Sequence, residues 1–130
     1  MTKGTPIDLL GSFDSLTRLE GRNPATADDE LKDSFTMLSE YRNGGAFAST
    51  FSGNSEWERH PNGDELVFAV EGQTDLVLLV QGKEVRNTLN AGYLIVIPKN
   101  TWHRFETDGV RILTLTPQPT DHYSGRKPRD

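Results

Sequence analysis

Residues 57–65 read Trp-Glu-Arg-His-Pro-Asn-Gly-Asp-Glu, and residues 98–103 read Pro-Lys-Asn-Thr-Trp-His. Each stretch holds turn-forming residues at the tip of strand-like sequence, and each carries a histidine beside its turn. A hairpin at the first turn brings His60 beside Glu65, where the next strand begins, and His103 follows the second turn. If the two turns meet in the folded chain, two imidazoles and a carboxylate converge at one point.

Imidazole and carboxylate groups together suit a divalent transition metal, here Fe, Mn, Ni or Zn. The predicted ligands are His60, Glu65 and His103. Glu58 is a fourth candidate, because it lies two residues before His60 and shares its face on a strand. Such a set leaves coordination positions for water, substrate or dioxygen. The competing interpretation is a buried His–Glu hydrogen-bonded pair without metal, and the two matching turn-borne clusters favour the metal.

The composition predicts one globular domain and argues against a nucleic-acid partner. A chain of 130 residues is long enough for one core. The formal net charge is -5 with no basic stripe before the tail, which argues against nucleic acid. The absence of cysteine excludes disulfides and thiolate metal sites. No apolar run is long enough to span a membrane, so a cytoplasmic location without membrane contact is expected.

Dense strand and turn punctuation over residues 33–117 predicts an all-β sandwich or barrel of eight or nine short strands. Residues 1–32 are predicted to form a mostly irregular N-terminal extension. Within it, residues 5–8 resemble a helix start, and Gly11 would end that helix within two turns. Residues 118–130 form a polar C-terminal tail whose end is predicted to be disordered.

A second group of residues is a candidate substrate pocket. Period-two alternation places Phe47, Ser49 and Phe51 on one face of a strand, and Phe105 shares a face with His103. Two aromatic rings with a hydroxyl between them suit a small organic ligand. Ordinary core packing explains the aromatic residues equally well.

Three further residues are predicted to lie away from the site. Trp57 and Arg59 have the opposite strand parity to Glu58, so both are expected to face outward. Trp57 is expected to pack against a partner sheet or subunit. His122, at the start of the polar tail, is predicted to be a surface residue.

The first cluster resembles the first motif of the cupin superfamily, G-x5-H-x-H-x3,4-E-x6-G. His60 and Glu65 stand at the longer spacing that this motif allows, and Gly72 follows at the expected distance. Glu58 stands where the motif has its first histidine. That substitution leaves three roles open for Glu58: it ligates the metal, swings away, or acts as a general base.

The second cluster resembles the second cupin motif, G-x5-P-x-G-x2-H-x3-N. Gly92, Pro98 and His103 all stand in register with it. Asn100 replaces the motif glycine and Thr107 the motif asparagine, and asparagine is among the few residues that tolerate the left-handed backbone region. Together the two motifs cover residues 53–107.

The resemblance implies a double-stranded β-helix, or jelly-roll barrel, that holds a metal at one end. Many single-domain cupins form homodimers, which makes a homodimer the expected assembly. Cupins include dioxygenases, isomerases, epimerases, decarboxylases, lyases, sugar-binding and regulatory domains, so the fold alone does not choose a function.

The ligand set favours a small-molecule enzyme, most specifically a non-haem metal-dependent oxygenase. Two imidazoles and one carboxylate match the set that leaves a face open for dioxygen and a chelating substrate. The alternatives are a metal-dependent isomerase or lyase with Glu58 as catalytic base, and a module that binds a small ligand without turnover.

Overall fold

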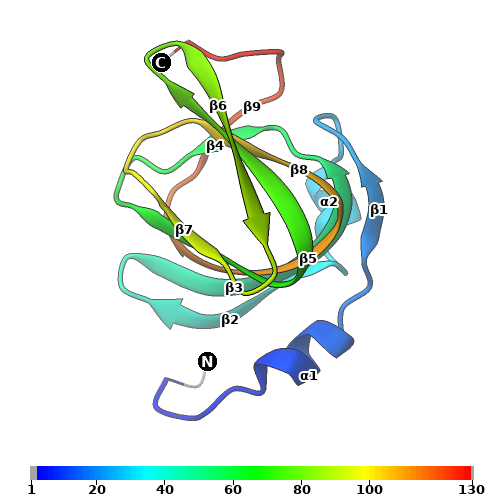
Figure 1. The fold of residues 1–130 in the computed structure, drawn as a ribbon. Helices are drawn as coiled ribbons and strands as arrows, with labels where there is room; N and C mark the ends of the chain where they lie inside the picture. Colours follow the sequence, from blue (N-terminus) through cyan, green and yellow to red (C-terminus); the bar gives the residue numbers. More distant parts are fainter. Residues whose placement is uncertain (1–2, 130) are drawn as a thin grey trace.

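Strands dominate the computed structural model of the chain, which describes residues 3–129 (Figure 1). The helices are α1 (Leu9–Asp14) and α2 (Asp28–Leu31). The strands of the described residues are β1 (Leu19–Arg22), β2 (Phe35–Tyr41), β3 (Gly44–Asn54), β4 (Trp57–Arg59), β5 (Glu65–Val80), β6 (Lys83–Asn90), β7 (Leu94–Ile97), β8 (His103–Pro117) and β9 (Asp121–Tyr123). The predicted all-β barrel is confirmed.

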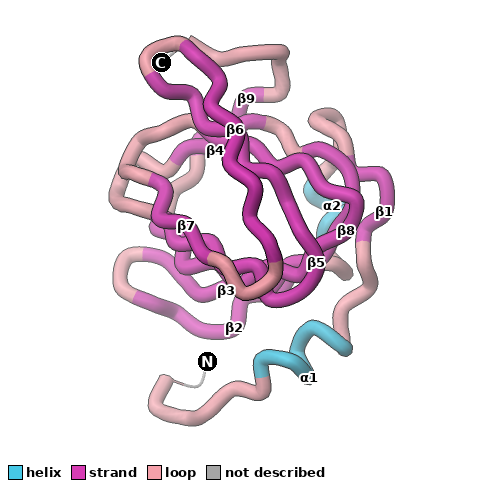
Figure 2. Tube along the Cα trace, viewed as in Figure 1, coloured by secondary structure: helices cyan, strands magenta, loops and turns pink. Residues whose placement is uncertain are grey.

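Two long strands, β5 and β8, organise the barrel. They pair antiparallel with each other, β8 also pairs with β3 and β4, and β5 also pairs with β6 and β7. The strands curl around a common centre (Figure 2). β1 runs parallel to β3, whereas the other strand pairs within residues 3–129 are antiparallel.

β5 and β8 are each long and continuous, whereas the sequence predicts short strands. The cause is a close crossing near Gly72, which has a φ of 79°. A Cβ atom at that position would lie 2.2 Å from the carbonyl oxygen of Gly109. Glycine therefore lets both strands bend past each other without breaking their pairing, although the register shifts nearby.

The interior of the barrel is apolar. Its core consists of Phe51, Val67, Ala69, Leu76, Leu78, Leu89, Ile97, Phe105, Val110 and Ile112. A second, smaller cluster lies on the outer face of the sheet and contains Trp57, Val77, Leu79 and Trp102. The first cluster fills most of the barrel interior, and the polar site described below lies at one end.

The C-terminal tail is ordered as far as residue 129, contrary to the predicted disorder. The indole Nε1 of Trp57 donates a hydrogen bond to the carbonyl oxygen of Arg126 (3.0 Å), and that of Trp102 donates to the carbonyl oxygen of Arg129 (3.2 Å). Buried indole N–H groups need acceptors, and the tail backbone supplies them. Trp57 therefore packs under this chain's own tail rather than against another subunit.

The N-terminal extension is mostly irregular, as predicted, but its first helix begins later than expected. Asp8 caps α1 by accepting a hydrogen bond from the backbone N–H of Gly11 (3.0 Å). Gly11 lies inside this helix and does not end it. Phe13 is fully buried, and β1 joins the barrel sheet. The predicted domain limits of 33–117 stay a prediction. No helix of the described residues has both the length and the apolarity to cross a membrane.

Candidate metal centre

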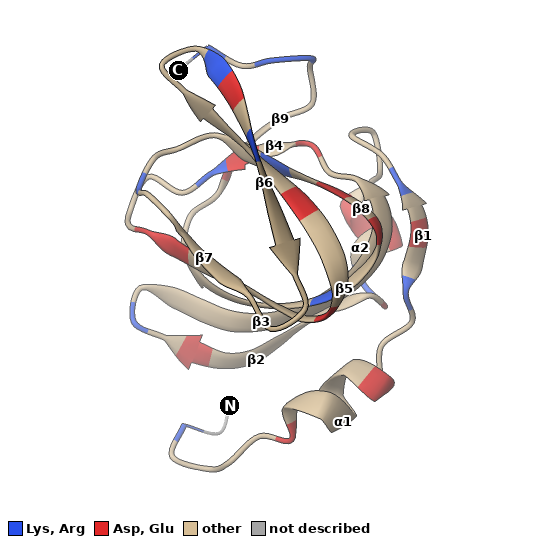
Figure 3. Cartoon of the chain, in the orientation of Figure 1, with Lys and Arg blue, Asp and Glu red and all other residues tan. Residues whose placement is uncertain are grey.

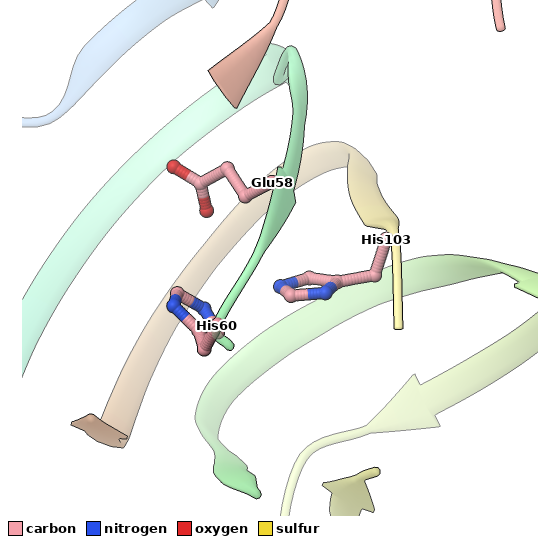
Figure 4. Close-up of side chains that lie close together, drawn as sticks. All are labelled: Glu58, His60 and His103. Atoms are coloured by element: carbon pink, nitrogen blue, oxygen red, sulfur yellow. The ribbon is translucent and has the colours of Figure 1, made fainter. Parts of the chain in front are cut away.

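The two turns meet. The backbone N–H of Asn100 donates to the carbonyl oxygen of His60 (2.9 Å), and that of Lys99 donates to the Asp64 carboxylate (2.7 Å). β4 and β8 are also paired at this end of the barrel. These contacts bring the side chains of the two clusters together (Figure 4).

Glu65 lies between the two histidines. Its Oε1 atom is 3.2 Å from Nε2 of His60 and 3.1 Å from Nε2 of His103. All three side chains are buried, with His103 at 0% exposure. Two ligand atoms that bind one metal at about 2.1 Å and at right angles to each other are about 3.0 Å apart. The spacing of the three atoms therefore fits neighbouring ligands of a single ion.

The outward atoms of these side chains are held by polar partners. His103 Nδ1 lies 2.9 Å from the carbonyl oxygen of Thr101, which can only accept, so Nδ1 carries the proton. In the neutral ring, Nε2 then presents a lone pair to Glu65. His60 Nδ1 is 3.0 Å from the Thr120 hydroxyl, and the Thr116 hydroxyl donates to Glu65 Oε2 (2.6 Å). Such partners orient metal ligands in proteins.

The inward atoms are the unsatisfied ones. Among the described residues, buried side-chain atoms without a hydrogen-bond partner are His60 Nε2, Glu65 Oε1 and His103 Nε2. Each histidine Nε2 is close enough to Glu65 Oε1 for an ion pair, but the contact is an ion pair only if that imidazole ring is protonated. With neutral His103, a lone pair faces a carboxylate at 3.1 Å, and the two repel unless a cation lies between them. The residues therefore fit a metal ion.

The electrostatics of the cluster keep the Glu65 carboxylate ionised. Burial is the largest single influence and raises the pKa of the Glu65 carboxyl, but the close approach and charge of the two imidazoles together lower the pKa to about 2. Burial is again the largest single influence and lowers the pKa of His103, but the close approach and charge of Glu65, the charge of Glu58 and the Thr101 carbonyl together raise the pKa. A carboxylate that stays ionised inside the barrel favours positive charge beside it.

Glu58 stands further out. One ligand atom from each of Glu58, His60 and His103 lies within 4.8 Å of the others (Figure 4). The Oε2 atom of Glu58 is 3.7 Å from Nδ1 of His122. The same Nδ1 atom is 2.7 Å from a carboxylate oxygen of Glu56. Glu65 is thus the carboxylate in contact with both imidazoles, and the role of Glu58 stays a prediction.

A cavity of about 640 Å³ adjoins the cluster. Glu58 and Glu65 line it. The four residues proposed from sequence as a pocket also line it, namely Phe47, Ser49, Phe51 and Phe105. The cavity is therefore in contact with both carboxylates and has aromatic walls.

Further lining residues were not predicted from the sequence. They are Arg22, Asp28, Leu31, Lys32, Phe35, Ile112, Thr114, Thr116, Gln118, Pro119, Thr120 and His122. His122 is half-exposed, as a surface residue would be, yet it borders the cavity. The N-terminal segment and the end of β8 reach the cavity through long-range pairing, which local sequence does not reveal.

Arg59 faces away from the site, as its strand parity predicts. Its Nε atom pairs with Asp121 (2.9 Å), and its guanidinium stacks over the Trp102 ring at 4.5 Å. It therefore belongs to the outer face.

The family described as the cupin domain matches residues 51–116, just over half of the chain and the region of both clusters. The chain belongs to the cupin family. Two curated relatives are an uncharacterized protein of Acanthamoeba polyphaga mimivirus, 32% identical over 54% of this chain, and the uncharacterized protein YdbB of Bacillus subtilis, 37% identical over 43% of it. The matched regions make up 45% and 47% of those relatives, so this cupin spans a little under half of their length.

Solved structures show the same fold. Protein NMB1881 from Neisseria meningitidis is 16% identical with a TM-score of 0.66, and covers 88% of this chain and 100% of its own. A cupin-2 protein from Shewanella frigidimarina is 23% identical with a TM-score of 0.55, covering 65% and 80%. Hydroquinone 1,2-dioxygenase from Sphingomonas is 18% identical with a TM-score of 0.56, covering 65% of each chain. At these identities the likeness describes the fold.

Proposed function

We propose that this cupin is a metal-dependent enzyme for a small organic substrate, with oxygenase-type chemistry. His60, Glu65 and His103 would hold a divalent Fe, Mn, Ni or Zn ion. The observation that carries the proposal is the convergence of three buried, unpartnered ligand atoms beside a cavity. In a closed structural site, protein ligands fill every coordination position of the metal. Three protein ligands leave at least one position open.

The protein's own residues supply binding, orientation and exclusion of water. Thr101 holds the His103 ring in the tautomer that directs Nε2 inward, and Thr116 fixes the Glu65 carboxylate. The buried rings of Phe51 and Phe105 keep that end of the cavity apolar. When bound, the metal would polarise a substrate oxygen or activate dioxygen.

The oxygenase assignment rests on the ligand set. Two imidazoles and one carboxylate are typical of non-haem iron oxygenases. A hydroquinone 1,2-dioxygenase shares the fold, and the activity of that protein supports the proposal.

The second candidate is isomerase or lyase chemistry with Glu58 as general base. It is favoured by the position of Glu58, which lines the cavity but lies outside the contacts between Glu65 and the imidazoles. A base in that position would face a bound substrate from the side of the metal cluster. Non-catalytic binding of a small ligand is the third alternative.

Metal content and oxygen uptake test the proposal together. Protein purified without chelators or a His-tag and reconstituted with Fe, Mn, Ni or Zn should hold about one metal ion per chain. The Fe(II)-loaded protein should consume oxygen with one or more substrates from a panel of catechols, thiols and small diketones. Metal occupancy without oxygen uptake, together with proton exchange that Glu58→Gln abolishes, would select the isomerase or lyase alternative.

A homodimer is the proposed assembly. Among the described strands β7 pairs with β5 alone, so one edge of β7 is free. Tyr93, Leu94 and Val96, at or beside this edge, are 61%, 56% and 51% exposed. Exposed apolar strand edges favour pairing with another chain. Light scattering should give the mass of a dimer, and Val96→Lys should lower it towards the monomer.

A further inference from the structure

Arg22 is a cationic residue of the cavity lining that the proposed metal chemistry leaves unused. It ends β1, a strand with basic residues at or beside both ends (Figure 3). It pairs with Gly53 of β3, and a Cβ atom at Gly53 would lie 2.1 Å from the Arg22 carbonyl oxygen. Glycine at that position therefore allows β1 to approach closely and brings Arg22 to the cavity lining.

The Arg22 guanidinium is partly buried without an ion-pair partner. Its Cζ atom lies 4.7 Å from the centre of the Phe51 ring. Burial lowers the pKa of Arg22, while the charges of Glu58 and Glu56 act in the opposite direction. Within residues 3–129 no carboxylate forms an ion pair with it, whereas Arg59, Arg86, Arg104 and Arg111 each have at least one. A guanidinium held in a cavity without a partner suits an anionic ligand.

The rest of the cavity limits what that anion can be. Phe47, Phe51 and Phe105 provide apolar walls, which suit a ring or a branched aliphatic body. Glu58 and Glu65 both line the cavity, so a second negative charge on the ligand away from Arg22 would be repelled unless it bound the metal. The lining therefore combines two cations, aromatic walls and acidic groups. Of the two cations, Lys32 is exposed and pairs with Asp29 (3.8 Å), which leaves Arg22 as the unpaired one.

We propose that Arg22 binds the carboxylate of the substrate, and that the substrate is a small monocarboxylate with an apolar body. This assignment specifies the substrate class of the proposed function. That the bound carboxylate belongs to a substrate rests on the proposed function. The recognition itself requires only Arg22 and the cavity. It can therefore be tested in protein with and without metal.

Benzoate and benzamide are suitable probes, because they share size and shape and differ in charge. Their affinities are measured by ligand-observed NMR and calorimetry with the zinc-loaded protein and with chelator-treated protein. We expect benzoate to bind about tenfold more tightly than benzamide in both forms. Arg22→Met should remove that preference by lowering the affinity for benzoate to that for benzamide. Arg18→Met is the matched control, because Arg18 bonds Thr50 and lies outside the cavity lining; it should keep the preference.

Three results would overturn the inference: equal affinity for both probes, no benzoate binding, or a benzoate preference that survives Arg22→Met. A preference that appears only with zinc and is insensitive to Arg22→Met would assign the carboxylate to the metal instead. Failure of the proposed function looks different. The protein would then take up no metal, yet Arg22 would still select benzoate over benzamide. Circular dichroism of each variant confirms that the barrel is folded.

Discussion

The two faces of β4 carry alternate residues of the same strand, yet their polar groups differ in whether they are paired. Glu58 and the following His60 face the interior, where buried polar atoms meet without hydrogen-bond partners. Trp57 and Arg59 face outward, where the indole N–H and the guanidinium are both paired. The outer face is therefore satisfied by the chain itself, whereas the inner face keeps buried polar atoms without partners.

This difference separates stability from function. Unsatisfied buried polar groups destabilise a fold unless a ligand compensates them. Buried tryptophan with a paired N–H stabilises it. Substitutions on the inner face should thus change metal binding with little loss of stability, and substitutions on the outer face should do the reverse.

The largest effect is expected from His103→Ala. This change removes one of three ligands, so metal occupancy after reconstitution should fall below a tenth of an ion per chain, a rough threshold that excludes specific binding. Metal analysis of the purified variant measures it. His122→Ala is the control, because His122 is half-exposed and lies outside the Glu65 contacts; its occupancy should match the wild type. Unchanged occupancy in His103→Ala would contradict the proposed ligand set.

Trp57→Ala should give the largest loss of stability. Trp57 is 1% exposed and its Nε1 bonds the tail at Arg126. Removing such a side chain costs about 3–5 kcal/mol in the free energy of unfolding. Denaturant unfolding measures the loss, and the fraction that stays folded should still bind metal. Trp57→Phe keeps most of the packing and should cost much less. Equal losses in the two variants would show that the hydrogen bond, rather than packing, dominates.

An intermediate effect is expected from Thr116→Val. The Thr116 hydroxyl donates to Glu65 Oε2, and loss of such a supporting group lowers metal affinity about 10- to 100-fold. A competition titration against a chelator measures the affinity. Thr120→Val, at His60, should act in the same direction. If both variants keep the wild-type affinity, these hydroxyls do not support ligands.

The smallest effect on metal affinity is expected from Glu58→Gln. Glu65 Oε1 contacts both histidines, whereas Glu58 lies further out. Glu65→Gln should therefore lower metal affinity far more than Glu58→Gln, in the same competition titration. Equal losses in the two variants would make Glu58 a fourth ligand.

The convergence of His60, Glu65 and His103 could be predicted because each residue lies beside a turn and the motif spacing is local. The placement of Phe47 and Phe105 along the cavity followed from strand parity in the same way. These predictions need only period-two alternation and two hairpin-like turns. Which of these residues bind metal or substrate stays a prediction.

The remaining cavity residues depend on irregular or distant structure. Counting by twos from His103 would direct Thr114 and Thr116 outward, yet both line the cavity. The burial alternation of β8 changes phase between Phe105 and Val110, beside the close crossing with β5. Arg22 reaches the cavity because β1 pairs in parallel with β3, and no local sequence pattern predicts that pairing.

The most direct test of the central claim is a crystal structure with anomalous scattering recorded at the edge of the metal supplied. A single peak should lie about 2.0–2.3 Å from Nε2 of His60, Nε2 of His103 and a Glu65 oxygen. The contradicting result is a map without a peak after soaking in Fe, Mn, Ni and Zn in turn, with His103 Nε2 still 3.1 Å from Glu65. That arrangement would make the cluster a buried, protonated His–Glu pair.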